Sequence, residues 1–170
     1  MNSRIKVVLF FSALLFIFHS TSFAANERYA YVDVAKIFDG YQKTKDQDKT
    51  LQDVGKTKEQ GRDALVQDIR KMKDELALLS EDAKGKKQES LDVKVRELED
   101  FDRDAKRQLG EERNKVVREI FKDIDDVVKR FGERKGFDLI LNERALLYNN
   151  PRLDITEEVL KELNSSYKKK

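Results

Sequence analysis

The sequence predicts a mostly α-helical protein in which a long antiparallel coiled-coil hairpin projects from a small body with short β-strands. Three observations lead to this class. Charged residues make up 40% of the 170 residues, with the two signs nearly balanced, which is typical of long solvated helices. Apolar residues in a long central segment recur in steps of three and four, as in the seam of a coiled coil. Short apolar runs suited to strands flank that segment on both sides.

The central segment, residues 38–131, has an apolar pattern that is symmetric about Gly85. Residues equidistant from a bend lie at the same height of an antiparallel helical hairpin, so a symmetric seam predicts this arrangement. We expect an arm at residues 39–130, with its tip near residues 80–90. The mirrored pairs are Leu79 with Leu91, Met72 with Leu98, Ile69 with Phe101, Leu65 with Ala105, and Val54 with Val116.

Residues 1–24 are typical of a cleaved signal peptide. Arg4 and Lys6 precede an apolar run at residues 7–18, and small residues mark a cleavage site after Ala24. Because the run is shorter than the roughly 20 residues of a comfortable membrane span, cleavage is favoured over an uncleaved anchor. Removal of this segment leaves 33 basic and 33 acidic side chains, so the exported chain has a formal net charge of zero.

Residues 25–38 form the first part of the predicted body. Alternation along residues 28–34 places Ala30, Val32 and Val34 on one face, which predicts a half-buried strand. Asp33 is positioned to cap a helix that begins at Val34 or Ala35. This helix is expected to continue into the descending limb of the arm.

Residues 131–164 complete the body. Apolar runs at residues 137–141 and 145–148 predict two further short strands, joined by a polar turn. The spacing between Asp154 and Glu157 matches a capping box that opens a last helix. Residues 165–170 are predicted to form a polar, basic tail.

The body carries more large apolar side chains than three short strands are able to bury. We therefore predict that it self-associates and leaves the arms free, although burial alone does not set the number of copies. The residues assigned to the core of the body or of the oligomer are Ala30, Val32, Val34, Phe121, Phe131, Leu139 and Leu141.

Two sets of arm residues are candidate functional sites. Gly61 and Gly110 are expected at one height of the seam, and since glycine costs about 1 kcal/mol against alanine in a helix, they indicate a flexing point. Close approach of the two helices is an equally good explanation of these glycines. Lys84, Lys86 and Lys87 offer a contact patch at the tip for an anionic membrane or an acidic client, although such charge runs usually only solvate a loop.

The composition argues against catalysis and metal binding. The sequence has no cysteine, and its single histidine, His19, lies in the predicted signal peptide. Zinc chemistry and thiol or Ser–His nucleophiles are therefore poorly supported, and we predict no catalytic residues, no metal and no cofactor. Zero net charge, an arm without an aromatic stacking platform and an export signal argue against nucleic-acid binding.

The order of these blocks resembles the Skp family, also called OmpH-like proteins. The match includes residues 31–33 after the signal peptide and the charged hairpin. Its most specific part is the succession of residues 137–141, 145–149 and 154–160, which in the family form a strand, a second strand and a final helix. The resemblance implies a jellyfish-like homotrimer whose arms enclose a cavity. It also implies an ATP-independent periplasmic chaperone that holds unfolded outer-membrane β-barrel proteins.

One feature departs from the better-known members of that family, which are strongly basic. Basic members use their charge to hold acidic clients and to contact lipopolysaccharide or anionic lipid, whereas this neutral chain would have to rely on local patches. The alternative function is that of an extracytoplasmic coiled-coil structural or tethering protein with one folded partner. A chaperone binds several denatured barrels and suppresses their aggregation, but a tether ignores unfolded chains.

Overall fold

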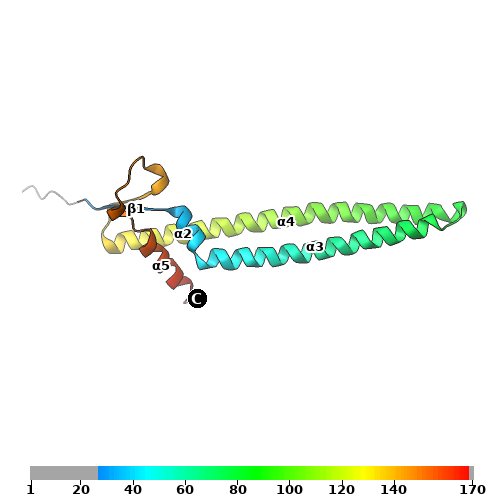
Figure 1. Cartoon of the computed structure of the whole chain (residues 1–170), viewed down its shortest axis with the longest axis horizontal. Coiled ribbons are helices and arrows are strands. Elements are labelled where there is room, and N and C mark those ends of the chain that lie inside the picture. The colour runs from blue at the N-terminus through cyan, green and yellow to red at the C-terminus, as the bar shows by residue number, and fades with distance from the viewer. Residues whose placement is uncertain (1–26, 169–170) are drawn as a thin grey trace, which may run out of the picture.

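The computed structural model describes residues 27–168 as a small body from which one long two-helix arm projects (Figure 1). The predicted fold class is therefore confirmed, while the predicted signal peptide at residues 1–24 lies outside the described residues. In chain order, the elements are strand β1 (Tyr29–Val32), helices α2 (Val34–Gly40), α3 (Gln42–Ala77) and α4 (Glu81–Lys135), strand β2 (Leu139–Asn142), the 3-10 helices η1 (Glu143–Ala145) and η2 (Pro151–Leu153), and helix α5 (Thr156–Tyr167).

The arm reverses direction at residues 78–80, earlier than the predicted tip near residues 80–90. Gly85, expected at the centre of the bend, lies in the second turn of α4. Glu81 and Asp82 occupy the first turn of α4, where acidic side chains interact favourably with the positive end of the helix dipole. The polar stretch after Ser80 therefore forms a solvated helix start, and the bend was predicted too late in the chain.

Contacts across the arm show how the early bend changes the helix register. A Cβ added at Gly61 would lie 3.1 Å from the Cζ atom of Phe101, so these two residues face one another. The symmetric pattern had placed Phe101 opposite Ile69, about two helical turns away. Arg62 Nε donates to Asp102 Oδ1 over 3.1 Å in the same part of the arm. The predicted pairs are therefore wrong in detail, although the antiparallel arrangement holds.

Strands β1 and β2 form a two-stranded parallel sheet, with Tyr29 opposite Leu139 and Val32 opposite Asn142. Parallel neighbours need a crossover connection, and here the whole arm provides it. Tyr31 also bridges to Asp154, and its carbonyl accepts from the backbone N–H of Ile155 over 3.0 Å. This contact buries Tyr31, which alternation had placed on the face opposite the core.

The predicted strand at residues 145–148 is not formed in the described chain. After β2, the chain turns into η1, because the Asn142 side chain accepts from the backbone N–H of Arg144 over 3.2 Å. Leu147 and Tyr148 then stand in solvent, with exposed fractions of 109% and 84%. A continuous apolar run is typical of a strand that is covered on both faces, but in the described chain residues 145–148 pair with neither β1 nor β2.

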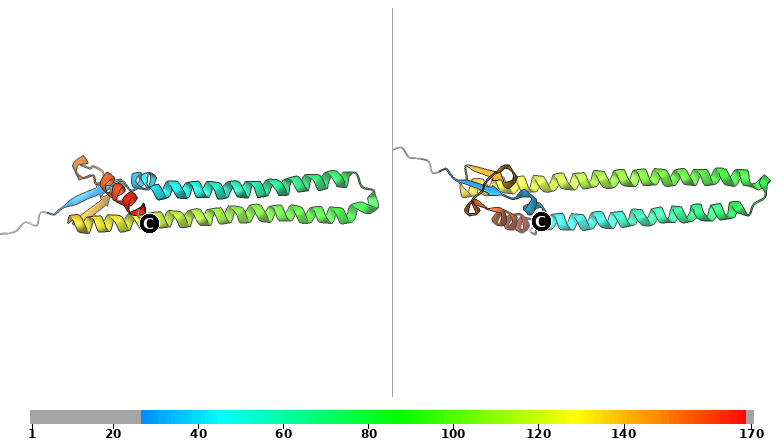
Figure 2. Two further views of the ribbon diagram at one scale, coloured as in Figure 1. Left: turned by 90° about the horizontal axis from the view of Figure 1, so that it is seen from below. Right: turned by 45° about the horizontal axis from the view of Figure 1, so that its top comes forward.

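Helix α3 does not continue α2, contrary to the expectation of one descending helix. Tyr41 interrupts them in an extended conformation, and Asn164 of α5 stabilises the break: its side chain accepts from Gln42 N over 2.7 Å and donates to the Gly40 carbonyl. Figure 2 shows α5 against this junction.

Helix α5 begins at Thr156, beside Asp154, and continues to Tyr167, three residues into the predicted basic tail.

The hydrophobic core lies where the sheet, α2 and α5 pack on the last turns of α4. Of the predicted core residues, Ala30, Val32 and Phe131 are buried, whereas Val34 and Leu141 are partly buried. Phe121 and Leu139 remain 47% and 46% exposed. The buried cluster consists of Ala30, Val32, Ile37, Tyr41, Val116, Ile120, Ile124, Val127, Phe131, Ile155, Val159 and Leu163.

Candidate functional site

The arm is only two helices thick, so its seam shields few side chains from water. Between residues 45 and 115, the only buried hydrophobic residues are Ile69 and Leu91, which are 7% and 5% exposed. Both belong to the predicted a/d seam. Most of the arm therefore presents side chains to its surroundings on every side, which makes its surface the natural place to look for a binding function.

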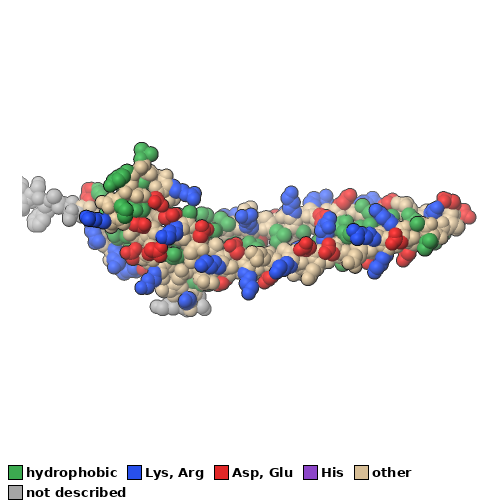
Figure 3. Space-filling view, in the orientation of Figure 1, with side chains coloured by type: hydrophobic (Ala, Val, Ile, Leu, Met, Phe, Trp, Pro, Cys, Tyr) green, Lys and Arg blue, Asp and Glu red, His purple; other side chains and the backbone are tan. Residues whose placement is uncertain are grey.

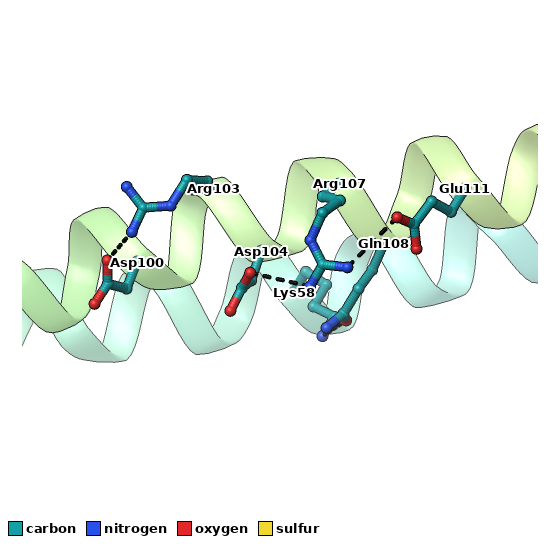
Figure 4. Close-up of polar contacts among 7 residues, drawn as sticks. All are labelled: Lys58, Asp100, Arg103, Asp104, Arg107, Gln108 and Glu111. Carbon is teal, nitrogen blue, oxygen red and sulfur yellow. Dashed lines mark hydrogen bonds and ion pairs between the residues drawn. The ribbon is translucent and has the colours of Figure 1, made fainter.

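Charges of both signs are interleaved along this surface. On the face drawn in Figure 3, Lys and Arg side chains alternate with Asp and Glu over the full length of the arm. Figure 4 shows neighbouring turns of α4, where Arg107 binds Asp104 over 3.2 Å and Glu111 over 3.4 Å. Lys58 on α3 donates to Gln108 across the hairpin over 2.9 Å. Exposed pairs of this kind contribute little to stability, but they solvate the arm.

Large apolar side chains on the arm surface are few and separated from one another. Val54, Leu78 and Val93 are 42%, 88% and 54% exposed. Val54 lines a shallow groove of about 320 Å³ on α3, together with Thr50 and Thr57. The surface therefore offers isolated apolar contacts among charges instead of one binding pocket.

The three candidate lysines lie on the first turns of α4, not in a loop. Lys84 pairs with Glu81 on the same helix, and Lys87 pairs with Glu75 across the bend. Lys86 is exposed. Two of the three positive charges are therefore shared with carboxylates, which weakens the attraction of this patch for an anion. A role in contacting an anionic membrane or an acidic client stays a prediction.

Gly61 and Gly110 do not lie at one height of the arm. Gly61 packs against the ring of Phe101, whereas a Cβ at Gly110 would meet nothing within 4 Å. Gly61 faces Phe101 instead, and Gly110 lies about two and a half helical turns beyond Phe101 on α4. The alignment of the two glycines was inferred from the symmetric pairing, which the early bend shifts. Flexing of the arm at either glycine stays a prediction.

The root of the arm contains a polar cluster that the sequence analysis did not identify. Tyr41 is buried and its hydroxyl donates to Asp123 Oδ2 over 3.2 Å, while Lys43 Nζ binds the same oxygen over 2.8 Å. Burial, reinforced by the charge of Asp123, raises the pKa of Tyr41, so the phenol remains a protonated donor. A cleft of about 310 Å³ opens beside it. Nothing in local sequence connects Tyr41 with Asp123, 82 residues away.

The body presents the largest exposed apolar side chains outside the arm. Phe121 of α4 lies beside Phe38 of α2, with 5.4 Å between the ring centroids. These two rings line a groove of about 490 Å³ that reaches Asn142 at the end of β2. Leu139 of β2 and Leu147, which are both exposed to solvent, lie elsewhere on the same body. This distribution matches the sequence argument that a single body has more apolar surface than it buries.

Residues 27–168 contain no cluster of three or more His, Cys, Asp or Glu side chains arranged to hold a metal ion. Within the same described part of the chain, no helix combines the length and the apolar character needed to cross a membrane.

A family model described as "Outer membrane protein (OmpH-like)" matches residues 28–163, which include both strands and the whole arm. The chain belongs to this OmpH-like family. The match begins just before β1 and ends within α5, so it covers the body as well as the arm.

Individual OmpH-like relatives agree with this assignment. The chaperone protein Skp of Vibrio cholerae is 24% identical over 149 residues, covering 81% of this chain and 83% of that protein. Skp of Yersinia enterocolitica is 36% identical over 63 residues, and this match spans only 36% of its length. The crystal structure of an OmpH-like protein from Caulobacter crescentus has a TM-score of 0.76 at 13% identity, covering 84% of this chain and 86% of that one. This last comparison shows the fold.

Proposed function

We propose that this protein is an ATP-independent periplasmic holdase chaperone. It binds unfolded outer-membrane β-barrel proteins in a cavity between helical arms, prevents their aggregation and aids their delivery to the outer membrane. The observation that carries the proposal is the OmpH-like family match over residues 28–163, supported by relatives that are named as Skp chaperones. These relatives are chaperones and not enzymes, so no catalytic residue is assigned.

The surface of the arm is suited to a holdase. A client that must be released without an energy source has to be held by many weak contacts, because a few strong ones would make release slow. Val54, Leu78 and Val93 offer isolated apolar contacts, and the interleaved charges keep the arm and its client solvated. No single pocket on the arm competes with this distributed surface.

The cavity requires more than one copy, because a single arm encloses nothing. We therefore include a homotrimer in the proposal, with the bodies associated and three arms projecting to one side. The exposed Phe121, Leu139 and Leu147 on the body support self-association. Export follows from the predicted signal peptide at residues 1–24. Contacts with anionic lipid or lipopolysaccharide are a weaker part of the proposal, because the exported chain is formally neutral.

The test is light scattering of a urea-denatured outer-membrane barrel diluted with and without the purified protein. Suppression of aggregation at about one trimer per client is expected, with the trimer measured by size-exclusion chromatography and multi-angle scattering. A trimer that binds a folded partner but leaves the aggregation of several barrels unchanged would support the tethering function instead. A monomer without effect on aggregation would contradict the proposal.

A further inference from the structure

We propose that the end of the body remote from the arm is a docking surface for an acidic, partly apolar segment of a second protein. We call this surface the basic end. It consists of Arg28, Arg130, Arg134, Lys135 and Arg152, together with a groove that Arg28 and Arg152 line. The surface lies on the body and away from the arm, so its role is separate from the proposed holdase function.

Basic residues are concentrated in the last turns of α4. Residues 129–136 contain four basic side chains and one acidic side chain, although the chain beyond residue 24 is formally neutral. On the face drawn in Figure 3, Lys and Arg side chains gather at the end of the body that faces away from the arm. Arg28 joins them, because its Nη1 donates to the Lys135 carbonyl over 2.5 Å. Two segments that are distant in sequence therefore place their positive charges together.

The cations of the basic end differ from those of the arm in their partners. On the arm, many cations pair with carboxylates of the same helix, as Arg107 does with Asp104. Within residues 27–168, Arg134 pairs with Glu162, but the other four cations of the basic end form no ion pair. Arg130 also lies one turn before Arg134 on α4, and like charges at this spacing repel each other. Carboxylates of a partner would relieve this repulsion.

The helix dipole explains only part of the pattern. Arg134 and Lys135 lie in the last turn of α4, where cations interact favourably with the terminal carbonyls. Arg28 does so through its hydrogen bond to Lys135. Arg130 lies before the last turn, and Arg152 belongs to η2. The dipole falls off within one turn, so it accounts for neither of these two arginines.

A groove of about 370 Å³ adds apolar contacts to the charge. Arg28 and Arg152 line it, and Glu27 is the only carboxylate in its lining. Tyr29 and Leu153, which are 45% and 43% exposed, provide apolar walls. The volume is at the small end of the range for ligand pockets. The groove is therefore suited to side chains of an extended segment and not to a large ligand.

These features favour an acidic polypeptide over a lipid surface. Four of the five cations are arginines, whose guanidinium groups bind carboxylates through two parallel hydrogen bonds. An apolar side chain next to such carboxylates would fill the groove between Tyr29 and Leu153. A membrane attracts basic residues through its surface charge and does not need a groove. We therefore expect a partner segment in which acidic and apolar residues alternate.

The position of the basic end keeps docking apart from client binding. The basic end lies at the last turns of α4, whereas the arm bends before the first turn of the same helix (Figure 1). A partner bound at one end of this helix leaves the surface of the arm uncovered. The protein is thus able to hold a client and a docking partner at the same time.

Fluorescence anisotropy with a labelled acidic peptide tests the docking surface in the purified protein. The probe is an octapeptide in which glutamate and leucine alternate. The variant with Arg130→Gln and Arg152→Gln removes two cations whose side chains form no hydrogen bond or ion pair within residues 27–168, so it should fold normally. Its Kd for the probe should rise by about threefold or more, as expected for the loss of two exposed ion pairs.

The matched control has Lys49→Gln and Lys56→Gln, at exposed positions of the arm. It has the same net charge as the first variant and should keep the wild-type Kd. A peptide of alternating glutamate and serine should bind more weakly than the probe, because it leaves the groove unfilled, and one of alternating glutamine and leucine should not bind. Equal Kd values for the two double variants would overturn the proposal.

Competition with a client separates this proposal from the holdase function. A saturating amount of unfolded outer-membrane barrel should not displace the glutamate–leucine peptide, since the arm and the basic end are separate surfaces. Displacement would show that the peptide binds as a client does, which would overturn the docking and leave the holdase function standing. Binding of the peptide at the basic end without any suppression of barrel aggregation would contradict only the holdase function.

Flotation with vesicles that contain phosphatidylglycerol tests a lipid surface as the other occupant. The variant with Arg130→Gln and Arg152→Gln should float to the same extent as the wild type. A variant that loses vesicle binding but keeps the wild-type Kd for the peptide would show that the basic end contacts anionic lipid, and this result would overturn the proposal.

Discussion

Gly136 ends α4 in a left-handed conformation, with a φ of 69°, and its N–H donates to the Gly132 carbonyl. A side chain at this φ costs roughly 1–2 kcal/mol, so Gly136→Ala should lower the free energy of unfolding by about 1 kcal/mol. Gly85→Ala is the matched control inside α4, where nothing lies within 4 Å of the added Cβ. It should raise the free energy of unfolding by about 0.5–1 kcal/mol. Urea unfolding followed by circular dichroism measures both, and equal signs would contradict the assignment.

Gly61 and Gly55 are both helical glycines of α3, but only Gly61 faces a neighbour. Its added Cβ would lie 3.1 Å from Phe101, while one at Gly55 would meet nothing within 4 Å. Gly61→Val should therefore lower the free energy of unfolding by about 1–3 kcal/mol relative to Gly55→Val, because the larger side chain forces the helices apart. Thermal unfolding of the two variants measures the difference. Equal midpoints would show that α3 and α4 do not approach closely at Phe101.

At the scale of elements, Arg134 of α4 holds α5 through Glu162 Oε1 over 2.9 Å. This hydrogen bond, more than charge alone, keeps the pKa of Glu162 below its usual range. Since the folded pKa is lowered, the contribution to stability is present above the unfolded value, about pH 4.3, and is lost as the pH falls through the folded pKa. Glu162→Gln should therefore destabilise the protein at pH 7 by no more than about 1 kcal/mol, the usual ceiling for screened pairs.

The same variant should match the wild type once the pH is well below the folded pKa, as measured by urea unfolding across a pH series. Glu157→Gln is the control, because the Lys36–Glu157 pair joins α2 to α5 with both side chains more than half exposed. It should change stability less than Glu162→Gln at pH 7, where the Arg134–Glu162 interaction is fully present. A difference between Glu162→Gln and the wild type that persists at low pH would show that the glutamate stabilises the body through packing and not through its charge.

The sequence predicted those elements whose signals are local. The four-three repeat located both arm helices and the buried Ile69 and Leu91, and Asp33 caps α2 through a bond from Lys36 N, as expected. What it missed depends on contacts between distant residues. The break at Tyr41 is stabilised by Asn164, 122 residues from Gln42. The apolar pattern repeats every three or four residues, so it identifies the seam but does not fix which residues of the two helices face each other. For this reason the bend was predicted around Gly85 instead of at residues 78–80.

The candidate sites divide in the same way. Phe131 was assigned to the core of the body and is buried. The alignment of Gly61 with Gly110 depended on the register and was wrong for that reason. The strand at residues 145–148 was predicted from its apolar run, but in the described chain this segment pairs with no other strand. Composition indicated that the body has more large apolar side chains than short strands bury, and the structure shows that Leu147 and Tyr148 are among those left exposed.

At the scale of the whole molecule, electrostatics should contribute little to client binding. Beyond residue 24, the chain has 33 basic and 33 acidic side chains. Several of those on the arm pair with neighbouring opposite charges, as Arg107 does with Asp104 and Glu111. Such a surface has no long-range field to attract a client, and salt screens over about 10 Å at 0.1 M. Apolar contacts, in contrast, are not weakened by salt.

We therefore predict that the Kd for an unfolded barrel changes by less than about threefold between 0.05 and 0.5 M NaCl, as measured by fluorescence titration with a labelled client. A variant with Glu111→Lys and Asp104→Lys serves as the control, because it turns the neutral level around Arg107 into a basic patch. For a client with net negative charge, this variant should bind more tightly at low salt and lose the gain at high salt. A wild type that weakens tenfold or more over the same range would show that local charge patches hold the client, and the neutral composition would then conceal an uneven distribution of charge along the arm.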